Sequence, residues 1–131
     1  MINEAFLNQW APRLLSVLRI MTALLFLQHG LSKFFGWPVA TQHLTDYFTR
    51  AGAAGAIEIV GGVLLTLGLF SRCTAFILSG EMAFAYFLAH APRGFMPQTN
   101  GGEAAILFCF IFLYIAAAGP GPWALDRARR E

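Results

Sequence analysis

Several polar side chains of this sequence fall inside strongly apolar stretches or at their ends, where charge is costly and is usually kept for function. Imidazole, ammonium and amide groups donate hydrogen bonds, and carboxylates accept them or carry protons. Such a set suits the binding of a polar group on a small molecule. The candidate ligand-binding residues are His29, Lys33, Glu58, His90, Asn100 and Glu103. Two further residues, Arg19 and Glu81, lie deeper, and we expect them to form a buried ion pair.

The first apolar stretch carries its polar residues on one face of a helix. Arg19, Thr22, Phe26, His29 and Lys33 recur at steps of three and four residues. This is the spacing of a single face of an α-helix, which has 3.6 residues per turn. We therefore expect this face to point into the interior of a helical bundle.

Glu58 lies in the second apolar stretch among small residues. Gly55, Gly61 and Gly62 are three or four residues away from it along the chain. Small residues mark the side on which membrane helices pack closely, so we expect Glu58 to face the bundle rather than lipid.

The depth of these groups predicts where they meet. At about 1.5 Å per residue, Glu58 lies roughly 10 Å from the end at which its helix begins. Five helix-borne groups and the loop with Asn100 fall near the same level, and we expect the six candidate residues to converge at the extracytoplasmic end of the bundle.

The composition indicates that most of the surface faces lipid. Hydrophobic residues make up 57% of the 131 residues and charged residues 12%, whereas soluble domains have about 25% charged residues. Four stretches are near the ~20 residues that cross a bilayer as a helix. We predict an all-α integral membrane four-helix bundle, a single domain over residues 1–131. The predicted spans are residues 14–35, 51–70, 73–91 and 103–118.

The distribution of arginine predicts the orientation. An even number of spans places both termini on one side of the membrane. That side carries an excess of arginine: Arg13, Arg72, Arg127, Arg129 and Arg130, against Arg50 and Arg93 opposite. The positive-inside rule then places both termini in the cytoplasm. The net charge of +2 is too small to indicate nucleic-acid binding.

Structural readings of the same residues stay open. Lys33 and Glu58 suit an internal salt bridge without any ligand, and Lys33 also suits an interfacial position. Glu103 suits the N-terminal end of a helix, where the helix dipole favours a carboxylate. No metal-ligand spacing or catalytic triad is present, so no catalytic residue is assigned. Cys73 and Cys109 are predicted to be too far apart for a disulfide.

The ordered motifs of the chain resemble those of the DoxX family of small bacterial membrane proteins. The resemblance covers residues 14–126 and rests on five runs, FLQHGLSKF at 26–34, EIVGGVLL at 58–65, GLFSR at 68–72, NGGE at 100–103 and GPGP at 119–122. It implies a four-helix membrane protein in the bacterial inner membrane. The recurring polar positions of the family correspond to Arg19, His29, Lys33, Glu58, Glu81 and Glu103.

The resemblance also implies an association with membrane redox chemistry. The family is named for its similarity to the small membrane subunit of a thiosulfate:quinone oxidoreductase, which acts with partner subunits. The leading hypothesis is a redox-associated subunit that binds a quinone or a similar amphiphile. The alternatives are a transporter of a small solute or protons, and a non-enzymatic scaffold whose polar groups form structural salt bridges. Quinone is the cofactor that the leading hypothesis requires, and a haem ligated by His29 and His90 is a weaker alternative. A redox partner protein and a homo-oligomer are the protein partners considered.

Overall fold

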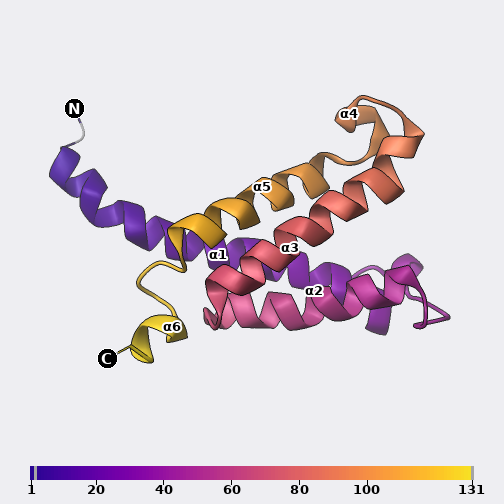
Figure 1. Ribbon diagram of the computed structural model, residues 1–131, viewed down its shortest axis with the longest axis horizontal. Coiled ribbons are helices and arrows are strands. Elements are labelled where there is room, and N and C mark those ends of the chain that lie inside the picture. The colour runs from indigo at the N-terminus through magenta and orange to yellow at the C-terminus, as the bar shows by residue number, and fades with distance from the viewer. Residues whose placement is uncertain (2, 131) are drawn as a thin grey trace.

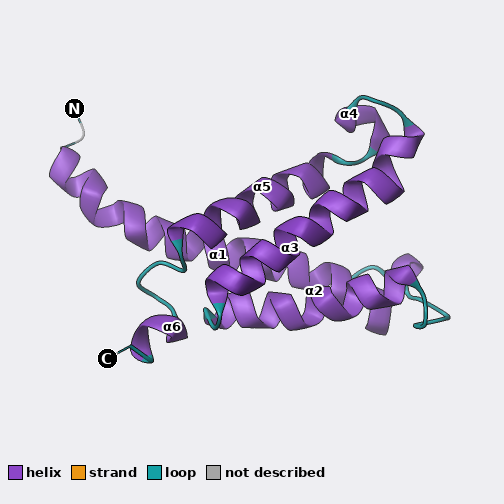
Figure 2. Cartoon of the chain, viewed as in Figure 1, coloured by secondary structure: helices purple, strands orange, loops and turns teal. Residues whose placement is uncertain are grey.

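The structure is a computed structural model that describes residue 1 and residues 3–130, and the regular secondary structure in this part of the chain is helical (Figure 2). This confirms the predicted all-α class. The long helices are α1 (Glu4–Phe35), α2 (Arg50–Leu67), α3 (Ser71–Ala85) and α5 (Glu103–Ala118). The short helical turns between and after them are η1 (Ala40–Gln42), η2 (Tyr86–His90), η3 (Ala91–Arg93), α4 (Pro97–Asn100) and α6 (Leu125–Ala128).

Several helix ends differ from the ends of the predicted membrane spans. α1 begins at Glu4, ten residues before the predicted start, because the Asn3 side chain caps it and Pro12 is accommodated inside the helix. α2 ends at Leu67 rather than at residue 70, because Gly68 adopts a left-handed conformation with φ 73°. The fourth predicted stretch, residues 103–118, coincides with α5.

Among the described residues, three helical segments are long and apolar enough to cross a membrane. They are Glu4–Phe35, Arg50–Leu67 and the continuous run Ser71–Arg93, whereas the 16-residue α5 is shorter. The run Ser71–Arg93 continues α3 through a π-helical turn, η2, and the 3₁₀ turn η3. The protein is therefore an α-helical membrane protein with several spanning segments.

The four long helices form two antiparallel pairs (Figure 1). α1 packs along α2, and α3 packs along α5. The two pairs lie together near the turn at residues 68–70 and diverge toward the other end, and both chain termini lie at the end with that turn (Figure 1). The common end for the termini agrees with an even number of spans.

Glycines bring α1 and α2 close together, as the small residues around Glu58 predicted. A Cβ atom on Gly30 would come within 2.8 Å of the Gly55 carbonyl oxygen. A Cβ on Gly62 would lie 2.9 Å from that of Leu27. Both distances are below van der Waals contact, so these positions hold the two helices at a separation that larger residues do not permit.

The apolar core joins the two pairs. Phe26 of α1 is 1% exposed, and its ring meets those of Phe112 and Phe108 on α5 edge-on, with centroid separations of 5.0 and 5.5 Å. Leu65 of α2 and Leu78 of α3 are buried in the same core. Edge-to-face aromatic contacts of this kind add to the dispersion energy of the packed core.

Arg19 is fully buried and binds backbone carbonyl groups rather than the predicted Glu81. Its Nε donates to the carbonyl oxygen of Leu65 at 2.9 Å, and its two Nη groups donate to those of Pro120 and Trp123. The predicted Arg19–Glu81 ion pair is therefore wrong. Arg19 lies fourteen residues before Lys33, about 21 Å along α1, whereas Glu81 lies close to Lys33.

The C-terminal segment is also attached through Asp126. Its carboxylate accepts hydrogen bonds from the backbone N–H groups of Phe70 and Ser71, both at 2.8 Å, and so caps the first turn of α3. Burial by itself would raise the pKa of Asp126. The hydrogen bonds from Ser71 and Phe70 and the charge of Arg129 outweigh that effect and lower the pKa below its ordinary value.

We predict that Arg19→Met lowers the free energy of unfolding by about 3 kcal/mol, because buried carbonyl groups lose their hydrogen-bond donors. Unfolding of the detergent-solubilised protein by sodium dodecyl sulfate, followed by circular dichroism, measures the loss. Arg13→Met is the control, since Arg13 packs over the ring of Trp10 and not on these carbonyls. Equal losses in the two variants would show that Arg19 does not hold the C-terminal segment.

Candidate functional site

The centre of the candidate site is an ion pair between α1 and α2. The Lys33 ammonium lies 2.7 Å from Glu58 Oε1 and 2.9 Å from Oε2. The side chain of Glu58 is 5% exposed and that of Lys33 is 23% exposed. The pair links the last turn of α1 to the middle of α2, as one of the sequence-based readings predicts. In largely apolar surroundings, the contact between the two charges offsets the desolvation cost of burying each of them.

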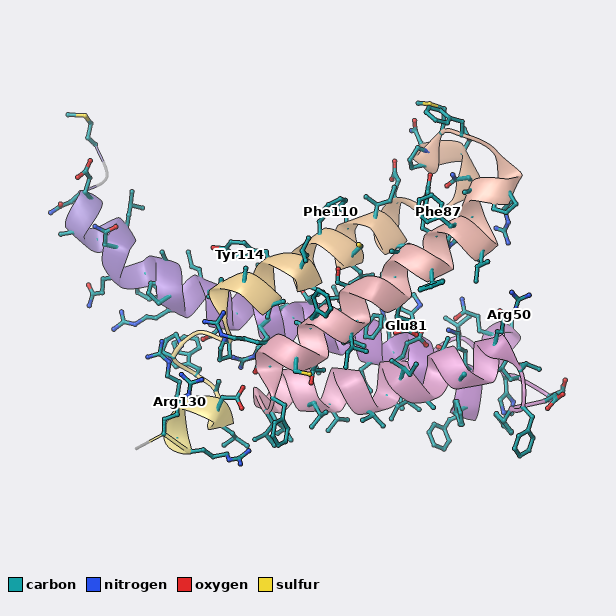
Figure 3. The ribbon with its side chains drawn as sticks, viewed as in Figure 1. Arg50, Glu81, Phe87, Phe110, Tyr114 and Arg130 are labelled. Carbon is teal, nitrogen blue, oxygen red and sulfur yellow. The ribbon has the colours of Figure 1, made fainter. Side chains whose placement is uncertain are left out.

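Glu81 of α3 adds a second carboxyl group to this ion pair. Both of its carboxyl oxygens are buried and lack a hydrogen-bond partner among the described residues. Glu81 is close enough to Glu58 and Lys33 for the charges of both to act on it, and Figure 3 shows it between the ribbons of α3 and α2. A buried polar group without a partner is rare and calls for an explanation such as a ligand, an ion or water.

The turn between α2 and α3 explains why the two carboxyl groups meet. Glu58 lies ten residues before Gly68, and Glu81 lies eleven residues after Phe70. Because the two helices run in opposite directions from the turn with the same rise per residue, both groups reach about the same depth. The similar distances of Glu58 and Glu81 from the turn can be read from the sequence, although the sequence-based prediction paired Glu81 with Arg19.

His29 completes this part of the site, one turn below Lys33 on α1. Its ring meets Phe108 of α5 edge-on at a centroid separation of 6.0 Å, and the charge of Lys33 acts on it. We call His29, Lys33, Glu58 and Glu81 the charged cluster. It draws residues from three helices and borders an aromatic side chain of the fourth.

Three other polar residues at this end, Tyr86, His90 and Asn100, form a separate loop cluster. Asn100 is 1% exposed, and its amide group donates to the Tyr86 hydroxyl at 3.2 Å and to the Gly94 carbonyl at 3.0 Å. His90 Nδ1 lies 3.2 Å from the carbonyl oxygen of Asn100. These bonds organise the connection between α3 and α5, and the Asn100 side chain is used within the loop.

The six candidate residues therefore do not all meet at one site. Lys33 and Glu58 meet directly, His90 and Asn100 meet in the loop, and Glu103 is exposed at the first position of α5. Sequence reasoning missed Tyr86, although it precedes His90 by four residues and so shares its side of a helical turn.

Chemically, the charged cluster offers donors and acceptors to one small ligand in an apolar setting. The Lys33 ammonium has three hydrogen-bond donors, and His29 has a ring nitrogen pair that can donate or accept. Glu81 supplies two oxygens without partners. The fold and this cluster define a polytopic α-helical membrane protein with a buried, ionisable polar site.

The family profile of DoxX matches residues 14–91. The chain belongs to the DoxX family, and the matched region contains all four residues of the charged cluster.

Relatives in other bacteria extend over nearly the whole chain. An uncharacterised protein of Haemophilus influenzae is 46% identical over 128 residues, which cover 92% of this chain and 93% of that one. CatD of Bacillus subtilis, which bears the name of a candidate oxidoreductase, is 29% identical and covers 84% of this chain and 82% of its own. The inner membrane protein YqjF of Escherichia coli is 27% identical, with 85% and 88% covered. No solved structure matches the chain.

We predict unequal stability effects for substitutions of the two buried carboxyl groups. Glu58→Gln removes the counter-charge of Lys33 and is expected to lower the free energy of unfolding by about 2 kcal/mol. Glu81→Gln removes no hydrogen bond and is expected to change it by less than about 0.5 kcal/mol. Unfolding of both variants in detergent measures the difference, and equal losses would contradict the assignment of the ion pair to Glu58 alone.

Proposed function

We propose that this protein is a redox-associated membrane subunit that binds a quinone, or a similar small amphiphile, at the charged cluster. The observation that carries the proposal is the buried carboxyl group of Glu81, which lies next to the Lys33–Glu58 ion pair and has no hydrogen-bond partner in the described part of the chain. A bound molecule with a hydroxyl or carbonyl group would supply the missing partner and remove the cost of leaving this group unpaired.

The chemistry of the charged cluster suits both forms of a quinone. A quinone carbonyl oxygen accepts a hydrogen bond, which Lys33 or His29 can donate. The hydroxyl group of the reduced form donates a hydrogen bond, which Glu81 can accept. Phe108, beside His29, offers an aromatic face for the ring. Carboxyl groups at this position also suit the proton transfer that accompanies quinone reduction.

The similarity to CatD supports the redox association, since that relative bears the name of a candidate oxidoreductase. The chain carries no motif for an electron carrier of its own, so electrons would pass between the bound quinone and a redox partner protein. The similarity to YqjF supports a place in the bacterial inner membrane. In that membrane we expect both termini to face the cytoplasm and α5 to serve as the fourth span.

Mass spectrometry of the organic extract from detergent-purified protein tests the proposal. We expect quinone in a near-stoichiometric amount from the native protein, and about tenfold less from Glu81→Gln, because the ligand loses its hydrogen bond to this buried carboxyl group. Glu103→Gln is the matched control, since it removes an exposed carboxyl group outside the charged cluster.

The composition of the extract also distinguishes quinone binding from a purely structural role of the charged cluster. Phospholipid alone in all three samples would contradict quinone binding and would favour a scaffold in which the Lys33–Glu58 pair only fixes the two helices. Equal quinone in Glu81→Gln and the native protein would place the ligand away from the charged cluster.

A further inference from the structure

A second polar region lies at the opposite end of the molecule, where both termini are found. A groove of about 1160 Å³ opens there between the first part of α1, the start of α3, the end of α5 and the C-terminal segment. None of the charged-cluster residues lines it. The groove is therefore a separate feature, and its interpretation does not rest on the proposed function.

The lining of the groove is strongly basic. Four arginines contribute to it, Arg72, Arg127, Arg129 and Arg130, and Asp126 is the acidic residue among its lining residues. Both carboxylate oxygens of Asp126 already accept backbone N–H groups at the start of α3. The groove thus presents an excess of positive charge with five N–H donors on each guanidinium group.

Two of these arginines are held in place by the protein. Arg72 donates to the carbonyl oxygens of Ala116, at 3.1 Å, and Ala117 at the end of α5. The guanidinium carbon of Arg129 lies 5.1 Å from the centre of the Phe70 ring. Arg127 and Arg130 are exposed on and after α6, and Figure 3 shows Arg130 beside α6.

Two tryptophans indicate that the groove lies near a membrane–water interface. Trp10 and Trp123, at this end of the molecule, are 39% and 52% exposed, as is typical of the aromatic belt of membrane proteins. The groove also has an apolar wall, with Pro12 and Leu15 of α1 and Tyr114 of α5. Basic residues therefore meet apolar helix surface at the level of lipid headgroups.

We propose that this groove binds the headgroup phosphate of an anionic phospholipid, with the acyl chains lying along the apolar surfaces of α1 and α5. Guanidinium groups bind phosphate oxygens through paired N–H donors. Basic pockets between membrane helices on the side rich in arginine suit anionic headgroups. A lipid also explains why one groove combines four arginines with an apolar wall, which a soluble anion does not require.

Native mass spectrometry of the full-length protein in a neutral detergent tests this proposal. The protein is titrated with phosphatidylglycerol and, in parallel, with phosphatidylcholine of the same acyl chains. We expect at least tenfold preference for phosphatidylglycerol. The double variant Arg127→Gln/Arg130→Gln is expected to lose about fivefold in affinity per arginine removed, with binding of phosphatidylcholine unchanged.

The matched control is Arg50→Gln/Arg93→Gln, which removes the same charge at the other end of the helices. It is expected to bind phosphatidylglycerol as the native protein does, and circular dichroism checks that both double variants are folded. No preference between the two lipids, or equal losses in the two double variants, would overturn the proposal. Displacement of phosphatidylglycerol by millimolar inorganic phosphate would also overturn it, since that result would identify a site for free anions.

Discussion

Lys33 and Glu58 come into contact in a part of the chain whose outer surface faces lipid, where neither charge can be solvated alone. This requirement constrains the helices around the pair. Their side chains meet only if α1 and α2 approach closely, and Gly30 and Gly55 permit that approach. The same close pairing leaves Glu81, on the adjacent α3, beside a satisfied ion pair and without a hydrogen-bond partner among residues 1 and 3–130. A structural ion pair and a candidate ligand group therefore follow from one arrangement of helices.

The opposite end of the molecule satisfies its buried charge differently. Within the part of the chain that the structure describes, Arg19 forms no salt bridge, and it instead donates to carbonyl groups of α2 and of the C-terminal segment. Asp126 then ties that segment to the first turn of α3. Backbone groups left open at helix ends serve here as partners for charged side chains. The two ends consequently have different roles, with a charged cluster at one and an arginine-rich groove at the other.

Periodicity and composition predicted the helical class, the inward face of α1 and the helix at residues 103–118, because these depend on local patterns. The small residues around Glu58 also predicted the close packing of α2, and the salt bridge of Lys33 with Glu58 was among the readings left open. The partner of Arg19 could not be predicted, because carbonyl groups of residues 120 and 123 become acceptors only once the C-terminal segment folds back. The separation of Asn100 from the charged cluster depends on the loop after α3, whose π-helical and 3₁₀ turns have no clear sequence pattern.

A double-mutant cycle on the ion pair tests the central claim most directly. The unfolding free energies of Lys33→Met, Glu58→Gln and the double variant are compared with that of the native protein in detergent. If the two side chains support each other, the double variant loses less than the sum of the single losses, with a coupling free energy of about 2 kcal/mol. Strictly additive losses would show that Lys33 and Glu58 act independently, and would contradict the account of the charged cluster given above.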